Sequence, residues 1–435
     1  MKRPVAITGL GVVSAAGIGI DALWDALGAG RSCIGPITSF DAEGFPSRLA
    51  AQVPEFSVRD WVPKSYRKAT KVMARDIELA VVSAKLAVDD AKLVTRGSED
   101  ENAKLTYPAS RLGCHVGAGL IAAETNELSY AFASARSDAD PTKLDLKKWG
   151  TSGMGNLPPL WLLKYLPNML ACHVTIVHGA EGPSNTITCG EASSLSSLGE
   201  SARVIERGKA DASIAGGGES KLNPMGMMRM WYAGQLAEVT EDDASRVGDI
   251  VQPFANVSRG GIAGESSGLL VLEALESARA RGASVHAVLS GFGAAMDVAD
   301  ATDSDPGASY WPIGTHQGVV GAVELALQDA NLSPDDIDLI VPQGVGVPSR
   351  DQAEWNALAE VFGDRLDSIA RIDLVPIIGL SWASQGAVQT AVAAACLSRG
   401  EIPVTDQKPR HALVCSYSMG GLAAAVVLSR ADGLP

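Results

Sequence analysis

Short runs of apolar residues alternate along this chain with longer, alanine-rich segments whose apolar positions recur at helical spacing. The short runs predict buried strands, and the longer segments predict helices. The predicted strands cover residues 5–7, 112–116, 186–188, 212–216, 268–273, 285–293, 339–342 and 413–416. The predicted helices cover residues 21–29, 76–90, 193–207, 315–330, 351–362 and 385–398. Strands that alternate with helices predict an α/β fold built on central sheets.

Two of the apolar runs share a feature, because a Gly-x-Gly pair that predicts a turn follows each of them. The runs begin at Val5 and Leu339, and the glycine pairs lie at 9–11 and 344–346. Alone, this is a weak indication of a duplicated chain, because Gly-x-Gly follows many strands. A dinucleotide-binding turn fits less well, since the segment 9–14 lacks the third glycine and no acidic residue ends a strand about 20 residues later.

Composition narrows the class of protein. The 435 residues are 46% hydrophobic and include 46 glycines, which is enough for a large packed core and two or three average domains. The formal net charge of −14 argues against a nucleic-acid partner, because phosphate backbones are bound by clustered Lys and Arg. No run reaches about 18 uninterrupted apolar residues, so no membrane span is expected. The apolar start is too short and glycine-broken for a signal peptide.

Cysteines and histidines indicate neither a metal site nor a cofactor. The cysteines lack metal-ligand spacing, which predicts free thiols in a reducing compartment and therefore a cytoplasmic protein. The histidines form no i, i+4 pair and no HExxH motif, so we expect them in the core or on the surface rather than as ligands. The six cysteines are Cys33, Cys114, Cys172, Cys189, Cys396 and Cys415, and the six histidines are His115, His173, His178, His286, His316 and His411.

A turn that opens into a predicted helix is the most informative segment. Residues 182–195 read Gly-Pro-Ser-Asn-Thr-Ile-Thr-Cys-Gly-Glu-Ala-Ser-Ser-Leu, with Glu191 near the helix start. Other segments accompany it in a fixed order, at 8–13, 113–120, 168–176, 207–219, 252–254, 264–273 and 416–421. Together they resemble the β-ketoacyl synthase family of the thiolase superfamily, whose enzymes form carbon–carbon bonds in fatty-acid and polyketide synthesis. The resemblance covers nearly the whole chain.

The resemblance implies a thiolase-like fold, in which two duplicated αβαβα halves with central mixed sheets stack about a pseudo-twofold axis. We place the N-terminal half at residues 1–255 and the C-terminal half at 256–435. It also implies a dimer in which strands of two subunits pair into one sheet. Residues 113–120 resemble the interface strand and loop, and 416–421 resemble the gating loop, with Met419 in place of the family's phenylalanine.

The family reaction needs a cysteine nucleophile and two histidines that donate hydrogen bonds to an enolate, and the resemblance places other residues at all three positions. Glu191 stands for the cysteine, Gln343 for the first histidine and Leu380 for the second. One lost donor of this kind typically costs about 3–4 kcal/mol of transition-state stabilisation. We therefore expect no family condensation by this chain alone.

Glu191 is a poor replacement for a thiol. Its attack on a thioester would give a mixed anhydride, which is higher in energy than the thioester consumed. As a general base it would still repel a malonyl carboxylate. Gln343 keeps an amide donor and so one weakened contact. Cys189 could be a displaced nucleophile, but a small packed residue is the commoner role of a free cysteine.

Two interpretations of Glu191 remain. The carboxylate could fill and rigidify the old nucleophile pocket, stabilised by the helix start by about 0.3–2 kcal/mol. Alternatively, its charge or shape acts on a partner's site across the dimer interface. The family has a precedent in the chain length factor, an inactive partner that typically carries glutamine there and forms part of the acyl tunnel wall. This chain differs in carrying glutamate.

By analogy with that factor, we expect this chain to pair with an active synthase paralogue, or with itself. The acyl carrier protein would then dock on the partner, since carriers are acidic and this chain is acidic too. The candidate tunnel and gate residues are Ala118, Gly119, Leu120, Ile121, Ala122, Met419, Gly420 and Gly421. Several of the apolar ones could instead simply pack the interface.

Two other functions stay open. The first is a divergent acyltransferase, decarboxylase or thioesterase that uses Glu191 or Cys189. The second is a small-molecule binder that reuses the acyl tunnel. The polar stretches 92–105 and 137–153 are expected to be loops.

Overall fold

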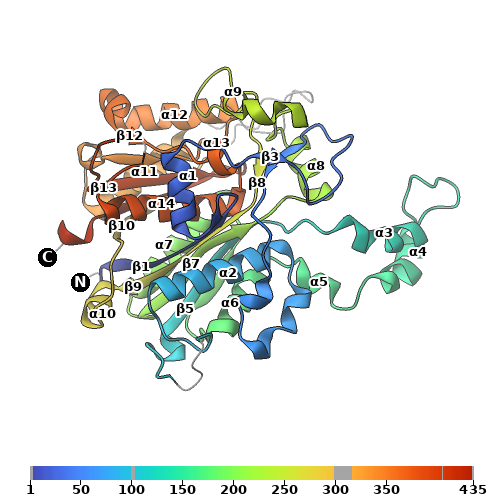
Figure 1. The fold of residues 1–435 in the computed structure, drawn as a ribbon, viewed down its shortest axis with the longest axis horizontal. Helices are drawn as coiled ribbons and strands as arrows, with labels where there is room; N and C mark the ends of the chain where they lie inside the picture. The colour runs from blue at the N-terminus through green and yellow to red at the C-terminus, as the bar shows by residue number, and fades with distance from the viewer. Residues whose placement is uncertain (1–2, 99–102, 298–315, 404, 434–435) are drawn as a thin grey trace.

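The structure is a computed structural model that describes residues 3–98, 103–297, 316–403 and 405–433. Within them, an 11-stranded sheet runs in the order β12-β11-β13-β14-β10-β1-β9-β7-β5-β6, with β2 paired to β1 (Figure 1). The path strands are β1 (Val5–Ser14), β5 (Leu112–Ala118), β6 (Ser184–Ile187), β7 (Ala212–Glu219), β9 (Ser266–Ala274), β10 (Ala287–Met296), β11 (Leu339–Val341), β12 (Ala370–Arg371), β13 (His411–Tyr417) and β14 (Leu422–Ser429). The short strand β2 spans Gly17–Ile18.

The sheet repeats one pattern twice. Along β6-β5-β7-β9-β1 the first two pairings are parallel, and the last two are antiparallel. In β12-β11-β13-β14-β10 the same sequence of pairings recurs. The two halves join antiparallel where Val5 meets Leu289 and Ile7 meets Ala287. The predicted α/β class with two similar halves is thereby confirmed.

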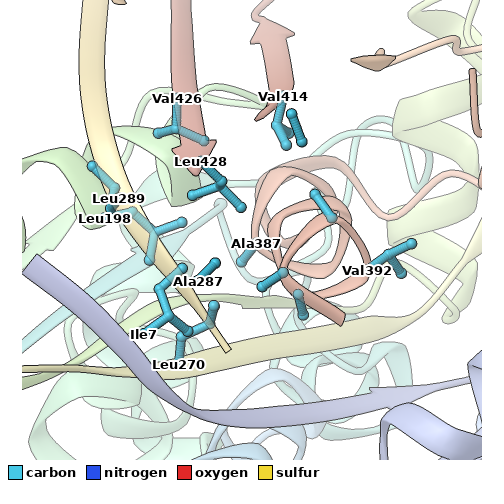
Figure 2. Packing of buried hydrophobic residues seen from close by; sticks show 14 of the residues in the cluster. Ile7, Leu198, Leu270, Ala287, Leu289, Ala387, Val392, Val414, Val426 and Leu428 are labelled. Carbon is cyan, nitrogen blue, oxygen red and sulfur yellow. The ribbon is translucent and has the colours of Figure 1, made fainter. Parts of the chain in front are cut away.

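Two helices form the centre of the molecule, because they contact strands of both halves. They are α7 (Ser193–Glu206) and α14 (Gln385–Arg399), and nearly every residue of α14 is buried. A helix that is apolar all round must be covered all round. Figure 2 shows Ala387 on the side of α14 that faces Leu270 and Leu428 from the two halves of the sheet, with Val392 on the other side of the helix.

The outer faces of the two halves are covered by further helices. Helix α2 (Arg75–Asp90) packs on β1, β9 and β7, and α6 (Met169–His178) packs on α2 and β5. On the C-terminal half, α11 (Gln317–Ala330) packs on β10 and β14, and α12 (Pro348–Phe362) packs on α11. Helix α1 (Ile20–Gly28) contacts β1 and α14. The layers alternate as the sequence periodicity predicts.

The predicted turn at 9–11 is wrong. Strand β1 continues through both glycines to Ser14. A Cβ on Gly11 would lie 1.9 Å from the carbonyl oxygen of Ser83 in α2, and one on Gly9 would lie 2.1 Å from that of Ala87. The glycines therefore serve close helix–strand packing rather than a turn. The second pair does form a turn, with Gly344 at φ 48° and Gly346 at φ 80°.

The other predicted helices and strands are found within a few residues of their expected bounds, apart from Thr315, which lies outside the described residues.

The prediction of an interface strand at 113–120 needs correction. Strand β5 is interior, between β7 and β6, so its hydrogen-bonding groups are already used. The sheet edge in this half is β6, where Ser184 and Asn185 are exposed.

An arm extends from the N-terminal half, away from the sheet (Figure 1). It contains α3 (Thr125–Ser134), α4 (Leu146–Lys148), η5 (Trp149–Gly153) and η6 (Met154–Asn156) and, at its base next to η3 (Ala69–Val72), α5 (Trp161–Lys164). The stretch 137–153 is therefore partly helical rather than a plain loop. Large apolar side chains are exposed on this arm, namely Tyr130, Phe132, Leu144, Leu146, Met154, Leu160 and Leu162. Exposed apolar groups gathered on one element are typical of an interaction surface.

Among the described helices, none has the length and apolar character needed to cross a membrane.

Candidate functional site

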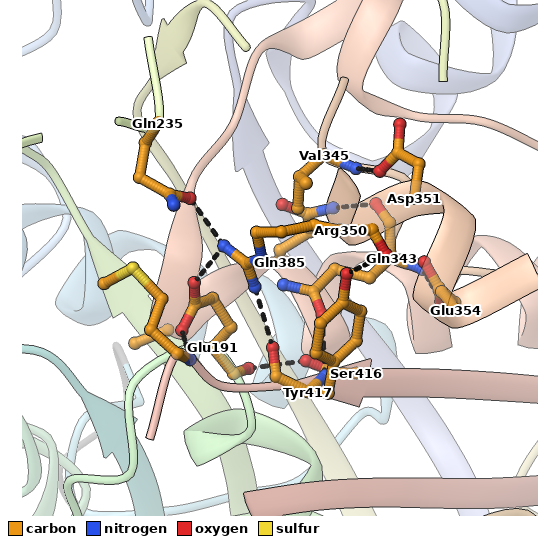
Figure 3. Close-up of polar contacts among 12 residues, drawn as sticks. Glu191, Gln235, Gln343, Val345, Arg350, Asp351, Glu354, Gln385, Ser416 and Tyr417 are labelled. Carbon is orange, nitrogen blue, oxygen red and sulfur yellow. Dashed lines mark hydrogen bonds and ion pairs between the residues drawn. The ribbon is translucent and has the colours of Figure 1, made fainter. Parts of the chain in front are cut away.

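Glu191 lies just before the N-terminus of α7, next to the N-cap residue Ala192. Only 1% of Glu191 is exposed to solvent. Its carboxylate is held from two sides. Arg350 donates from Nη1 to Oε1 over 3.0 Å, and the backbone N–H of Met419 donates to Oε2 over 3.3 Å (Figure 3). The Ser416 hydroxyl donates to the Glu191 carbonyl oxygen over 2.8 Å. Both carboxylate oxygens are therefore occupied by groups of the protein itself.

Among the described residues, the Glu191 carboxylate accepts from Arg350 and Met419 rather than from the N–H groups at the α7 start, so the expected hydrogen bonds from the helix start are wrong. No side chain caps α7, and the Ser193 N–H is directed to the Gly190 carbonyl. The charge of Glu191 is instead balanced by Arg350, which comes from α12, 159 residues away in the sequence. Burial is the largest single effect and lowers the pKa of Arg350, but the charge and hydrogen bonding of Glu191 and Tyr417 together outweigh it, and the pKa is raised.

Arg350 connects Glu191 to two further groups. It donates to Gln235 Oε1 over 2.5 Å and to the Tyr417 carbonyl over 3.2 Å. Its guanidinium stacks over the Tyr417 ring at 4.9 Å, and the Tyr417 hydroxyl donates back to the Arg350 carbonyl over 2.6 Å. This set of contacts suits arginine, whose planar fork can donate in several directions while it stacks on a ring.

Gln343 lies in the turn after β11, and that turn is fixed by two buried carboxylates. Glu354 accepts from the N–H groups of Gln343 and Gly344, and Asp351 accepts from those of Val345 and Gly346. Burial raises the pKa of Glu354 to about 7 and that of Asp351 to about 6, against the opposing effect of these bonds. These four hydrogen bonds hold the turn in place.

The side chain of Gln343 turns toward the 416–421 loop. Its Oε1 accepts from the Tyr417 N–H over 2.6 Å, and its Nε2 is buried without a partner among the described residues. Leu380 is completely buried in an apolar cluster with Val345 and Val375. Neither residue lines the cavity beside Glu191, so the expected oxyanion contact from Gln343 does not face that cavity.

A cavity of about 340 Å³ opens beside Glu191, at the lower end of the range for ligand sites. Its lining includes Ala118, Gly119, Leu120 and Met419 from the predicted tunnel and gate set, together with Thr188, Gly190, Glu219, Lys221, Arg229, Met230 and Trp382. Ile121 and Ala122 lie outside the cavity and are buried, with 4% and 3% of their surface exposed. Gly420 and Gly421 form the turn of the gating-like loop without lining the cavity.

The cavity wall contains a second buried ion pair that the sequence patterns do not reveal. Lys221 pairs with Glu219 and donates to the Leu120 carbonyl over 2.7 Å. Glu219 also accepts from the Ala383 N–H over 2.7 Å. A Cβ on Gly119 would lie 1.8 Å from a Glu219 oxygen, so only glycine leaves room for this carboxylate.

Asp76 lies behind this pair and accepts from the Ser220 N–H over 3.2 Å. Burial raises the pKa of Asp76 from 3.8 to about 7, although Lys221 pulls it down.

We expect Asp76→Asn to remove part of the pH dependence of stability. Because the folded-state pKa of Asp76 is raised, the folded state binds the proton more tightly than the unfolded chain between about pH 4 and pH 7. The free energy of unfolding should therefore fall as the pH rises through that window, by at most about 4 kcal/mol at about 1.4 kcal/mol per pKa unit. Urea unfolding across the window should give a flatter profile for Asp76→Asn, and parallel profiles would contradict the assignment.

Cys189 is part of the turn rather than of the cavity. Its N–H donates to the Ser193 hydroxyl over 2.8 Å, and its side chain does not line the cavity. Partial burial raises the pKa of the Cys189 thiol, so the protonated, weakly nucleophilic form prevails at neutral pH.

The histidines are engaged elsewhere. His115 contacts Ser201 and Ser213, His173 contacts Tyr66, His178 contacts Thr95, His286 contacts Asp90, His316 contacts Glu360 and His411 contacts Ser429. Within the described part of the chain, no three His, Cys, Asp or Glu side chains gather as metal ligands would.

Residues 2–278 match the N-terminal domain of the β-ketoacyl synthase family, and residues 286–407 match its C-terminal domain. This chain belongs to the β-ketoacyl synthase family. It is 29% identical to the 3-oxoacyl-[acyl-carrier-protein] synthase 2 of Coxiella burnetii, over 99% of each chain. The family membership inferred from the motifs is confirmed.

Solved structures extend this result to the fold. The ishigamide ketosynthase/chain length factor is 25% identical with a TM-score of 0.78, over 99% of each chain. A β-ketoacyl synthase from Burkholderia phymatum STM815 is 25% identical with a TM-score of 0.77, over 99% of this chain and 100% of the other. The predicted thiolase-like fold is confirmed.

Proposed function

We propose that this β-ketoacyl synthase family member is catalytically inactive in condensation and acts as a chain-length-factor-like partner of an active synthase in fatty-acid or polyketide synthesis. The observation that carries the proposal is the occupied carboxylate of Glu191. Arg350 holds one oxygen and the Met419 N–H holds the other. A carboxylate bound in this way is neither a free nucleophile nor a free base.

The residues at the positions of the family's two histidines support the same function. An enolate needs donors aimed at the oxygen on which charge develops. Leu380 has no polar side-chain group, and Gln343 directs its oxygen to the Tyr417 N–H. Neither residue lines the cavity next to Glu191. Activation of a malonyl thioester would therefore lack both of the family's donors.

A partner subunit has a surface to bind. The arm exposes large apolar side chains, and the edge strand β6 presents backbone groups that a second subunit could pair with. The acyl carrier protein would dock on that partner, and the complex would work in the cytoplasm. The similar ishigamide structure is a ketosynthase/chain length factor, which is the arrangement proposed here.

A divergent enzyme is the competing function, because a cavity does lie beside Glu191. General-base catalysis would require Arg350 to release the carboxylate. Nucleophilic catalysis by Cys189 would require its thiolate, which the raised pKa disfavours. We therefore rank the partner function first.

Co-expression with an intact Cys-His-His synthase paralogue tests the proposal. We expect the two to co-purify as one complex, and Leu146→Glu with Leu162→Glu on the arm should dissociate it, because both side chains are exposed and apolar. Leu325→Glu on α11 is the matched control, since Leu325 is 45% exposed but lies outside the arm. Failure to co-purify with any such synthase would remove the support for this function.

The isolated chain gives an independent test. After incubation with an acyl-carrier-protein thioester, intact-mass spectrometry should detect no covalent adduct. An adduct mapped to Cys189 or Glu191 would establish the enzyme instead. Turnover that Glu191→Gln abolishes would do the same.

A further inference from the structure

The 416–421 loop is held by Glu191 and Arg350. The Ser416 hydroxyl donates to the Glu191 carbonyl, the Met419 N–H donates to its carboxylate, and Arg350 donates to the Tyr417 carbonyl. The Tyr417 side chain is stacked under Arg350 and bonded to its carbonyl. Every attachment point is at least half-buried, and Figure 3 shows them converging on Glu191 and Tyr417.

This fastening fixes one wall of the cavity. Met419 lines the cavity, and its N–H is held by the same carboxylate that Arg350 pairs with. The loop closes on itself through the Ser418 N–H, which donates to the Leu422 carbonyl, and the Gly421 N–H, which donates to the Ser418 carbonyl. A movement of Met419 would therefore break charge-assisted hydrogen bonds in a buried place.

The second wall is fixed by the other ion pair. Leu120 lines the cavity from the N-terminal half, and its carbonyl accepts from Lys221 over 2.7 Å. Lys221 is 4% exposed and is oriented by Glu219, which is itself anchored on the Ala383 N–H. The two walls thus come from different halves of the chain, and each depends on one buried cation.

We propose that Arg350 and Lys221 are positioning residues that fix Met419 and Leu120, and so set the length of acyl chain that the cavity admits. The acyl part of this inference rests on the proposed function, while the fixing of the two walls does not. Neither cation would touch the reacting atoms. Both act through the backbone of the loop that carries each wall residue, and Lys221 also lines the cavity itself.

Hydrogen exchange of the isolated chain tests the fixing of the walls. In Arg350→Gln, exchange in the 416–421 segment should become about tenfold faster or more, because the Met419 and Tyr417 contacts loosen. Residues 118–122 should keep their rates. Arg350→Lys should give an intermediate result, since a lysine keeps the charge but cannot also reach the Tyr417 carbonyl. Arg371→Gln is the matched control, because Arg371 also pairs with a carboxylate and stacks on rings but lies outside this cavity.

Lys221 variants should show the opposite pattern, with faster exchange at 118–122 and unchanged rates at 416–421. Because Lys221→Met leaves Glu219 unpaired, the double variant Glu219→Gln/Lys221→Gln is made alongside it. Equal acceleration of both segments in each variant would show general loosening and would overturn the fixing of the walls.

Product analysis with a co-purified active synthase tests the effect on chain length. With malonyl and acyl carrier thioesters, Arg350→Gln and Lys221→Met should shift the distribution of product lengths while total turnover persists. Lys221→Arg should restore the original distribution, and Arg371→Gln should leave it unchanged. An unshifted distribution in a stable complex would overturn the length inference yet leave the partner function standing. Failure of the complex to form would count against the partner function. The hydrogen-exchange data would still test whether the two cations fix the cavity walls.

Discussion

Replacing Arg350 with methionine will destabilise the protein by about 3–5 kcal/mol, because the charge of Glu191 is then buried without its partner. Arg350 is 10% exposed and Glu191 1% exposed as side chains, so solvent cannot compensate. Gln235 and the Tyr417 carbonyl lose their donor in the same variant. Urea unfolding at neutral pH, followed by circular dichroism, measures the loss.

The double variant Glu191→Gln/Arg350→Met is the decisive comparison. It removes both charges, so most of the stability lost in the single variant should return. Arg371→Met controls for the loss of an arginine that also stacks on aromatic rings, and its effect should be smaller because Arg371 is 35% exposed. If Arg350→Met cost no more than the Arg371 variant, the Glu191–Arg350 pair would not be an important part of this site.

Introducing the missing sulfur alone will not produce a condensing enzyme. In Glu191→Cys, the new thiol should lie at the α7 start beside Arg350, and both features favour its thiolate. We expect iodoacetamide to alkylate it faster than Cys189, whose pKa is raised. Condensation should nevertheless stay undetected, because each missing enolate donor typically costs about 10²–10³ in rate.

Two further variants separate the nucleophile from the donors. Glu191→Ser has nearly the same size as the cysteine variant but no thiol, so it controls for the loss of the carboxylate. Adding Gln343→His and Leu380→His to Glu191→Cys supplies imidazoles at the positions that the family resemblance identifies. A rate near that of an active synthase from Glu191→Cys alone, measured with carrier-bound acyl and malonyl groups, would refute the prediction that the missing donors prevent condensation.

In the proposed function, the buried charges of the site hold the cavity walls in place and perform no chemistry. Glu191 pairs with Arg350 and Glu219 pairs with Lys221, and both pairs also bind backbone groups of residues that line the cavity. Buried ion pairs are weak sources of stability but good sources of specificity in some proteins. A subunit that shapes a partner's product needs a fixed shape more than a reactive group.

The correspondence between sequence and fold is close for a physical reason. The apolar runs and alanine-rich segments predicted the strands and central helices because burial periodicity is a local property of the chain. The Gly-x-Gly at 9–11 predicts a turn that is not formed, because the pattern alone does not show that α2 packs against those glycines. The sequence does not determine the strand order either, so the resemblance places the interface strand at β5 although β6 is at the edge.

By itself, then, the sequence determined the family, the α/β layers and the presence of a carboxylate and not a thiol at residue 191. Only the tertiary structure decided what that carboxylate does. Arg350 reaches Glu191 across 159 residues of sequence, and Lys221 reaches Leu120 across 101. Such pairings are set by how the two halves stack and by the high cost of burying an unpaired charge, and neither leaves a local pattern in the chain.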